Sequence, residues 1–340
     1  MQEVNSPADR LENHQAENGR SESGAPGLVA AAPSRPSPHA IPGLKHGWLS
    51  RLRSYFVFDP LIWLYTLVMG LLALPGGLFD RSGRRLHWFS ATWSWLIMKT
   101  IASPVTVTGL DKIDASKPHV YAINHGSALD IPVIYANLPF QFRIAFKKEL
   151  LSYPVVGWQL KRSGQVCIDQ QNPSHSVHSI RKALKGLKAG LPLVIFPEGG
   201  RTPDGEIKPF LAGAFFLAIK AQVDIVPVAL VGTYELLPMN TYHIKSRPLE
   251  MRVGEPISTA GLKVRDLEAL SARVRKAVEE LYYRRCPPQH LAGSTPDLIP
   301  ELKIYLDLSF DLYWLAHQQV GPVQPLLHRS NGRRGQFLWA

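Results

Sequence analysis

Short apolar segments alternate with amphipathic helical segments after Pro104, and this alternation limits the fold of the chain more than any other feature. The strand candidates are Val105–Thr108, His119–Ile123, Gln165–Ile168, Leu193–Phe196, Ile225–Leu230 and Glu250–Val253. The helix candidates are a segment opened by Asn172-Pro173 and ended at Gly190, then Gly213–Ala221 and Val264–Arg285. Strands that alternate with helices predict an α/β domain, here with a mixed, mostly parallel sheet flanked by helices.

The 340 residues divide by composition into four predicted parts. Residues 1–45 are rich in Ser, Pro, Gly, Ala and charge, and they bury too little apolar surface to offset ordering entropy, so we expect a disordered tail. Residues 46–103 are predicted to be a membrane-associated two-helix element, and residues 104–286 the α/β domain. Residues 287–340 are a C-terminal extension, in which 297–319 is a further helix candidate.

The segment Phe56–Phe79 holds about twenty residues without a charge after Asp59, long enough to cross the core of a bilayer. Basic residues flank it at both ends: Arg51, Arg53, Arg81, Arg84 and Arg85. Because positive charge is nearly balanced, and Pro75-Gly76-Gly77 lies near its end, the segment also suits a helix that enters and leaves a membrane on one side. A buried core helix is the alternative.

The next segment, His87–Lys99, carries Trp88, Trp93 and Trp95. Tryptophan concentrates at the headgroup level of membranes, where one edge of the ring is wet and the other apolar. The segment therefore predicts an interfacial helix, with an ordinary packed helix as the alternative.

A net charge of +11 and a pI of about 9.6 indicate an anionic partner. No recognised nucleic-acid motif accompanies the charge, so we expect membrane lipid and phosphate and no nucleic acid. The two cysteines, Cys167 and Cys286, lie far apart and suggest neither a disulfide framework nor a zinc site. We predict no metal.

His125 and Asp130 follow an apolar strand candidate and lie five positions apart, in the stretch VYAINHGSALDIP. Neither a continuous helix nor a continuous strand would bring side chains at this spacing together. Gly126 and Ser127 supply a turn, and Asp130 starts a helix with Pro132 in its first turn. A carboxylate folded back onto an imidazole makes a histidine a good base, although a structural histidine is the alternative for this pair alone.

A second loop, between Phe146 and Gly164, is basic through Lys147, Lys148, Lys161 and Arg162. Taken alone it would be a solvated surface.

The third loop, FPEGGRTPDGEIKPF, follows the strand candidate at Leu193–Phe196. Gly199 and Gly200 allow a close backbone approach, and amides near Gly199 are candidates for stabilising an oxyanion. Arg201 offers a planar fork of donors that suits phosphate oxygens, and Glu198 is placed to orient that arginine or a substrate hydroxyl. The alternative is a tight turn with a surface salt bridge.

Other catalytic templates are missing from the sequence. It contains no GxxxxGK[ST], no GxGxxG after a strand, no HExxH and no GxSxG. Ser127 lies two residues after His125 but lacks the glycine-flanked elbow of a serine nucleophile.

Taken in order, NHGSALD, KKELLSYPVVGW, FPEGGRTPDG and IVPVAL resemble the four blocks of the glycerolipid acyltransferases, with the lysophosphatidate acyltransferase type the nearest match. The resemblance covers roughly residues 48–285. It implies that His125 is the catalytic histidine and Asp130 its partner. It also implies that the acceptor is bound by Lys147, Lys148, Glu198, Gly199 and Arg201. The two-helix membrane-docking element of the family matches Phe56–Phe79 and His87–Lys99, which favours two helices embedded from the cytoplasmic face of the cell membrane.

The chain departs from the family pattern at two positions. Gly200 stands where the third block usually has threonine, and Gln170 follows Cys167-Ile168-Asp169 where arginine is common. The resemblance implies acyl transfer to lysophosphatidate from acyl-CoA or acyl-carrier protein as co-substrate, with no cofactor. Alternatives are another acceptor (lyso-ornithine lipid, glycerol-3-phosphate or another lysophospholipid), a lipid-binding module without turnover, and a serine hydrolase using Ser127.

Overall fold

The computed structural model describes residue 39 and residues 46–80, 82–169 and 176–284. The predicted N-terminal tail, apart from His39, and the predicted C-terminal extension lie outside the described residues, as do Gln170 and the Asn172-Pro173 helix start.

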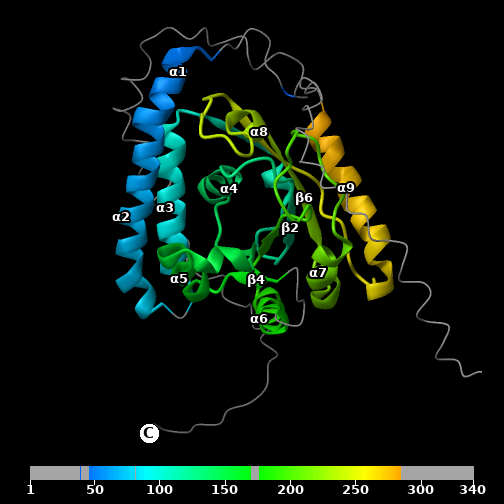
Figure 1. Ribbon diagram of the computed structural model, residues 1–340. Helices are drawn as coiled ribbons and strands as arrows, with labels where there is room; N and C mark the ends of the chain where they lie inside the picture. The colour runs from blue at the N-terminus through cyan, green and yellow to red at the C-terminus, as the bar shows by residue number, and fades with distance from the viewer. Residues whose placement is uncertain (1–38, 40–45, 81, 170–175, 285–340) are drawn as a thin grey trace, which may run out of the picture. The chain divides into compact units, whose positions relative to one another are not determined.

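A seven-stranded sheet forms the centre of the α/β domain, with the strand order β1-β7-β6-β2-β5-β3-β4. The strands are β1 (Val105–Thr108), β2 (Val120–Ile123), β3 (Arg143–Lys147), β4 (Val166–Ile168), β5 (Leu193–Ile195), β6 (Ile225–Val231) and β7 (Leu249–Val253). All neighbouring pairs are parallel except β6 and β7, which are antiparallel. The predicted mixed, mostly parallel sheet is therefore confirmed, and Figure 1 shows it flanked by helices.

Two hydrophobic clusters cover the two faces of this sheet. One packs α3 (Arg84–Thr100) and α4 (Asp130–Asn137) on side chains such as Tyr121, Ile123 and Val228. The other packs α6 (Val177–Lys188), α7 (Phe216–Ala221) and α9 (Leu267–Tyr283) on side chains such as Ala122 and Ala229. The strands are apolar on both faces because helices cover both faces.

Strand β3 was not among the strand candidates, and it lies between β5 and β4. The segment predicted as a loop between Phe146 and Gly164 contains the end of β3, the 3₁₀ helix η4 (Lys148–Ser152) and helix α5 (Pro154–Arg162). Charged residues at both ends of β3 leave only Ile144-Ala145-Phe146 as its apolar signal, which is too short to stand out from the sequence.

The N-terminal element is one 31-residue helical run, Trp48–Leu78, followed by α3. The run comprises α1 (Trp48–Arg53), a π-helical turn η2 (Ser54–Phe58) and α2 (Asp59–Leu78). It is long and apolar enough to cross a membrane, with a mean hydropathy of 1.9, and only 17% of its most apolar window is buried. Helices α2 and α3 lie side by side (Figure 1).

Glycines bring α2 against α3 and α5. A side chain at Gly70 would collide with Val155 of α5, and one at Gly77 would collide with Trp158 of α5 and Leu86 of α3. Trp93 of α3 donates its indole N–H to the Thr66 hydroxyl (3.0 Å). Helix α3 is thus packed between α2 and α4. Of its three tryptophans, Trp88 is exposed, and Trp93 and Trp95 are half-buried.

Candidate active site

The candidate site lies where β2, β5 and β3 end, at one edge of the sheet. These three strands are parallel neighbours, so their carboxyl ends meet at the same edge, where ligands bind in open α/β sheets. The loop carrying His125 follows β2, the loop carrying Glu198 and Arg201 follows β5, and Lys147 ends β3. The amide of Thr202 donates to the His125 carbonyl (2.9 Å), which ties the first and third loops together.

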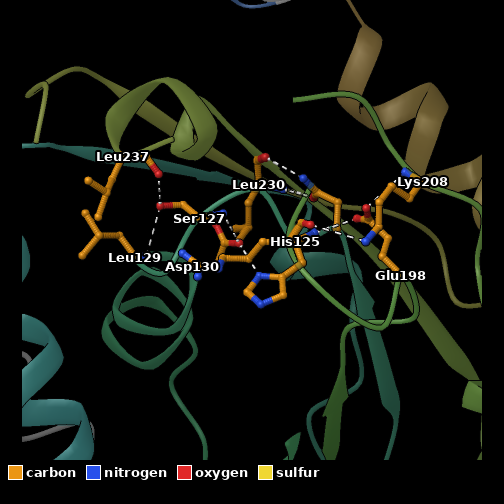
Figure 2. Close-up of polar contacts among 10 residues, drawn as sticks. His125, Ser127, Leu129, Asp130, Glu198, Lys208, Leu230 and Leu237 are labelled. Carbon is orange, nitrogen blue, oxygen red and sulfur yellow. Dashed lines mark hydrogen bonds and ion pairs between the residues drawn. The ribbon is translucent and has the colours of Figure 1, made fainter. Parts of the chain in front are cut away.

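The His125 and Asp130 side chains meet, as their spacing around a turn predicts. Nδ1 of His125 lies 2.7 Å from Oδ2 of Asp130, and the Ser127 amide donates to the same oxygen (2.9 Å; Figure 2). Asp130 is fully buried at the first position of α4, whereas the His125 side chain keeps 18% of its surface exposed. Because Nδ1 faces the carboxylate, Nε2 is the ring nitrogen left for a substrate.

The His125 ring is also fixed by an aromatic neighbour. It stacks on Phe196, with ring centroids 4.1 Å apart and an interplanar angle of 18°. Phe196 directly follows β5, so the start of the third loop helps to hold the imidazole in one orientation.

Glu198 links the third loop to the catalytic pair through backbone groups. Its Oε1 accepts the His125 amide (2.7 Å) and its Oε2 accepts the Lys208 amide (3.1 Å; Figure 2). Burial raises the pKa of this carboxyl, and the two amide donors act in the opposite direction. Both oxygens are engaged by the backbone, whereas the sequence suggested a contact with Arg201 or with a substrate hydroxyl.

Two polar residues of the first loop have structural partners that sequence reasoning missed. The Asn124 side chain donates to the Leu230 carbonyl (3.1 Å) and accepts the Leu230 amide (2.7 Å), which fixes the end of β2 to β6. A polar residue that ends an apolar strand was the available signal. The buried Ser127 hydroxyl donates to the Leu237 carbonyl (2.9 Å) and accepts the Leu129 amide (3.2 Å), so it is already engaged and does not face His125 as a nucleophile.

Cationic side chains gather around the third loop. Gly199 has a left-handed backbone (φ 68°), and its amide donates to the Phe196 carbonyl (3.1 Å). Lys147 reaches this loop, because a Cβ placed on Gly200 would lie 3.3 Å from the Lys147 Nζ. Glycine at 200 therefore leaves room for that ammonium group where threonine would crowd it. Arg201 immediately precedes the residue bonded to His125.

Lys208 joins this cluster and was missed from the sequence. Its Nζ donates to the Arg201 carbonyl (3.4 Å) and would lie 3.8 Å from a Cβ on Gly200. Its place in the third loop, seven residues after Arg201, was the only available signal. Lys148 lies elsewhere, since its Nζ forms an ion pair with Asp169 (2.9 Å) after β4. The adjacent Lys147 and Lys148 therefore lie in different surroundings, one near Gly200 and the other beside Asp169.

Tyr234 packs against the third loop. It belongs to α8 (Thr233–Leu236), which follows β6, and its hydroxyl donates to the Pro203 carbonyl (3.0 Å). Gly205 has a φ of 85°, and a Cβ there would lie 2.7 Å from the Tyr234 ring. The backbone of Gly126 also approaches the Tyr234 Cβ closely. One side chain therefore packs on both loops of the site.

The fold and this site define the class of protein. The family model described as acyltransferase matches residues 104–231, a range that includes β1 to β6 and the loops of His125, Lys147 and Arg201. Residues 104–231 are therefore similar to the acyltransferase family, in agreement with the resemblance inferred from the motifs.

Particular relatives narrow the class. The chain is 32% identical over 195 residues to the chloroplastic 1-acyl-sn-glycerol-3-phosphate acyltransferase BAT2 of Brassica napus, and the matched region covers 56% of each protein. It is 31% identical over 175 residues to the alpha enzyme of the same name from Bos taurus, covering 51% of this chain and 61% of that protein. The chain thus spans little more than half the length of these relatives. The crystal structure of the LPA acyltransferase PlsC from Thermotoga maritima matches with a TM-score of 0.54 and 25% identity, over 70% of this chain and 97% of that one.

Proposed function

We propose that this protein transfers a fatty acyl group from an acyl thioester to the free hydroxyl of lysophosphatidate, giving phosphatidate. The observation that carries the proposal is the contact of His125 with the buried Asp130 in a loop hydrogen-bonded to the loop of Arg201. The similarity to enzymes named for this reaction supports it. Acyl-CoA or acyl-carrier protein is the co-substrate, and the proposal requires no metal and no other cofactor.

His125 is the general base in this proposal. Its Nε2 takes the proton of the acceptor hydroxyl as the oxygen attacks the thioester carbonyl, and the carbon–oxygen bond forms. The carbon–sulfur bond then breaks, and the thiolate leaves with the proton from His125. Asp130 holds the proton on Nδ1 and stabilises the imidazolium, an interaction that its burial strengthens. No acyl-enzyme forms, because the thioester is already activated.

The cations around the third loop bind the acceptor phosphate. Arg201 provides paired donors, and Lys147 and Lys208 add positive charge at Gly200. Lys148 contributes less than the sequence suggested, because Asp169 neutralises it. Glu198 acts as a positioning residue through the His125 amide.

The N-terminal helical run places the site at the membrane surface in our proposal. Its outward side chains are large and apolar: Trp48, Leu49, Phe56, Trp63, Leu64, Leu67, Leu71 and Leu72. A spanning α2 would carry its neighbours α3 and α5, which it contacts between Tyr65 and Gly77, into a hydrocarbon core about 30 Å thick. We therefore place it along the cytoplasmic face of the cell membrane, with exposed Arg51, Arg84 and Arg85 near anionic headgroups.

A radiometric or thiol-release assay with acyl-CoA and lysophosphatidate tests the base role. His125→Ala should lower turnover by about 10²–10⁴-fold, as loss of a general base does. Turnover close to that of the wild type in a folded His125→Ala protein would remove this residue from the mechanism.

The phosphate role of Arg201 is tested in the same assay. Arg201→Ala should chiefly raise the KM for lysophosphatidate, whereas Arg265→Ala, which removes an exposed arginine from the 3₁₀ helix η7 (Val264–Asp266), should not. An unchanged acceptor KM contradicts the role. A panel with glycerol-3-phosphate and lyso-ornithine lipid as acceptors separates the proposed substrate from its alternatives.

A further inference from the structure

A groove runs along the edge strand β4, outside the site described above. Residues of helices α5 and α6 line it, and its volume is about 430 Å³, within the range of small-molecule sites. None of its lining residues belongs to the loops of His125 or Arg201. The groove is therefore a separate place where a second molecule can bind.

The groove is positively charged. Among the residues that the structure describes, three lysines line it, Lys148, Lys161 and Lys182, together with one carboxylate, Asp169. Lys148 pairs with that carboxylate at 2.9 Å. Lys161 and Lys182 are exposed, and within the described part of the chain neither forms an ion pair with an acidic side chain. Their charge is available to an anionic ligand.

Charge and apolar surface are ordered along the groove. Lys182 lies at the start of β4, because a Cβ on Gly164 would be 3.3 Å from its Nζ, and Lys161 comes from the nearby end of α5. Phe146, which pairs with Cys167 in the middle of β4, lines the groove, as does Leu160 beside Lys161. The Lys148–Asp169 pair lies at the carboxyl end of β4. A ligand with phosphate at one end and an uncharged arm would match this order.

One end of the groove lies at the carboxyl end of β4, on the catalytic edge of the sheet, because β4 is parallel to β3 and Asp169 lines the groove. Phe146 and Lys148 line the groove, while Lys147 between them reaches Gly200 of the third loop. Strands β4, β3, β5 and β2 are successive neighbours, and a spacing of about 4.8 Å per step puts β2 about 14 Å from β4. A long flexible thioester arm can cover that distance.

We propose that this groove binds the phosphorylated carrier end of the acyl donor, and that the donor is a nucleotide-linked thioester of the acyl-CoA type. Lys161 and Lys182 bind its phosphates, the pantetheine arm follows the apolar middle, and the thioester arrives at His125. This role rests on the proposed acyl transfer. A groove that two helices border, with charge at its far end, suits a small polyphosphate better than the surface of a carrier protein.

Calorimetric titration with CoA alone, without acceptor, tests the site independently of turnover. The double variant Lys161→Ala/Lys182→Ala should weaken CoA binding at least about tenfold, since contacts from charged groups to phosphate are lost. The matched control is Lys185→Ala/Lys188→Ala, which removes the same charge from α6 outside the groove and should keep the affinity of the wild type.

Steady-state assays then compare two donors. The loss in the double variant should appear as a raised KM for acyl-CoA and should shrink for an acyl-N-acetylcysteamine thioester, which has no phosphate. An unchanged CoA affinity in the double variant, an equal loss in the control variant, or turnover with acyl-carrier protein but no CoA binding would each overturn the assignment. If CoA binds and the double variant weakens it while no acyl transfer occurs, the site stands and the proposed reaction fails.

Discussion

The side chains around His125 and those on the outer face of the N-terminal helical run have opposite surroundings. The first are bonded within the chain, whereas the second are exposed. Around His125, the residues that hold the imidazole are bonded within the chain: Asp130 to His125 and Ser127, Glu198 to two amides, and Asn124 to Leu230. On the helical run, large apolar side chains such as Trp63 (72% exposed) and Leu67 (55%) remain largely exposed in the described structure.

This difference separates what the chain completes by itself from what it leaves to its surroundings. A catalytic pair must be rigid before substrate arrives, so Nδ1 of His125 and Oδ2 of Asp130 are paired in advance. An apolar face of this size is costly in water, and it indicates a partner that is apolar as well. The two regions should therefore fail in different ways when they are altered.

The largest expected effect is the loss of the carboxylate behind His125. Asp130→Asn keeps the size of the side chain but removes the charge that stabilises an imidazolium at Nδ1. We expect kcat to fall by about 10²–10⁴-fold with little change in the KM for the acceptor. Stopped or continuous thiol-release assays measure both constants.

A matched control is Asp80→Asn. The Asp80 carboxylate accepts the Gly83 and Leu86 amides (2.9 and 3.1 Å) at the start of α3, so its loss should lower stability and leave kcat nearly unchanged. If Asp130→Asn folds and keeps kcat within tenfold of the wild type, the pairing with His125 has no role in the reaction.

The next effect concerns the outer face of α2 and leaves the catalytic loops untouched. Replacing Trp63, Leu67 and Leu71 by glutamine removes three exposed apolar side chains at helical spacing. Partial insertion of three such groups contributes roughly 3 kcal/mol, so binding to anionic vesicles should fall about 10²-fold while the melting temperature changes little.

Sedimentation with phosphatidylglycerol vesicles measures this binding. Val264→Gln is the control, because Val264 is an exposed apolar residue outside the N-terminal run (42% exposed). Vesicle binding of the triple variant equal to that of the control would mean that this face does not contact lipid.

Some features of the catalytic region could be predicted from the sequence, and others could not. The strand β1 was predicted with its observed ends, and the start of α4 at Asp130 followed from Pro132 and the turn before it. These features depend on local signals, namely an apolar run and a helix start. The meeting of His125 with Asp130 followed from them, because a turn and a helix start leave few other arrangements.

Other features of the site depend on contacts between distant segments, which a local pattern does not encode. Lys147 and Lys148 are identical neighbours in sequence, yet one approaches Gly200 and the other Asp169, because β3 ends and a 3₁₀ turn begins between them. Glu198 was expected to face a substrate or Arg201, but its partners are amides 73 and 10 residues away in the chain. Tyr234 reaches the site only because β6 lies beside β2.

The smallest predicted effect concerns a buried histidine in the helix that joins the two regions. His87 of α3 lies between them, with its ring against Tyr135 of α4 and Phe142. Burial, helped by the nearby charge of Arg143, lowers the pKa of His87 from its ordinary 6.5 to about 3. Between these values the unfolded chain binds a proton that the folded chain refuses, so stability is full above pH 6.5 and falls as the pH drops below it. Urea unfolding at pH 7.5 and 5.5 should show the wild type losing about 1.4 kcal/mol more than His87→Phe over this interval. Should the variant retain the whole acid sensitivity, the burial of His87 between α3 and α4 is not its source.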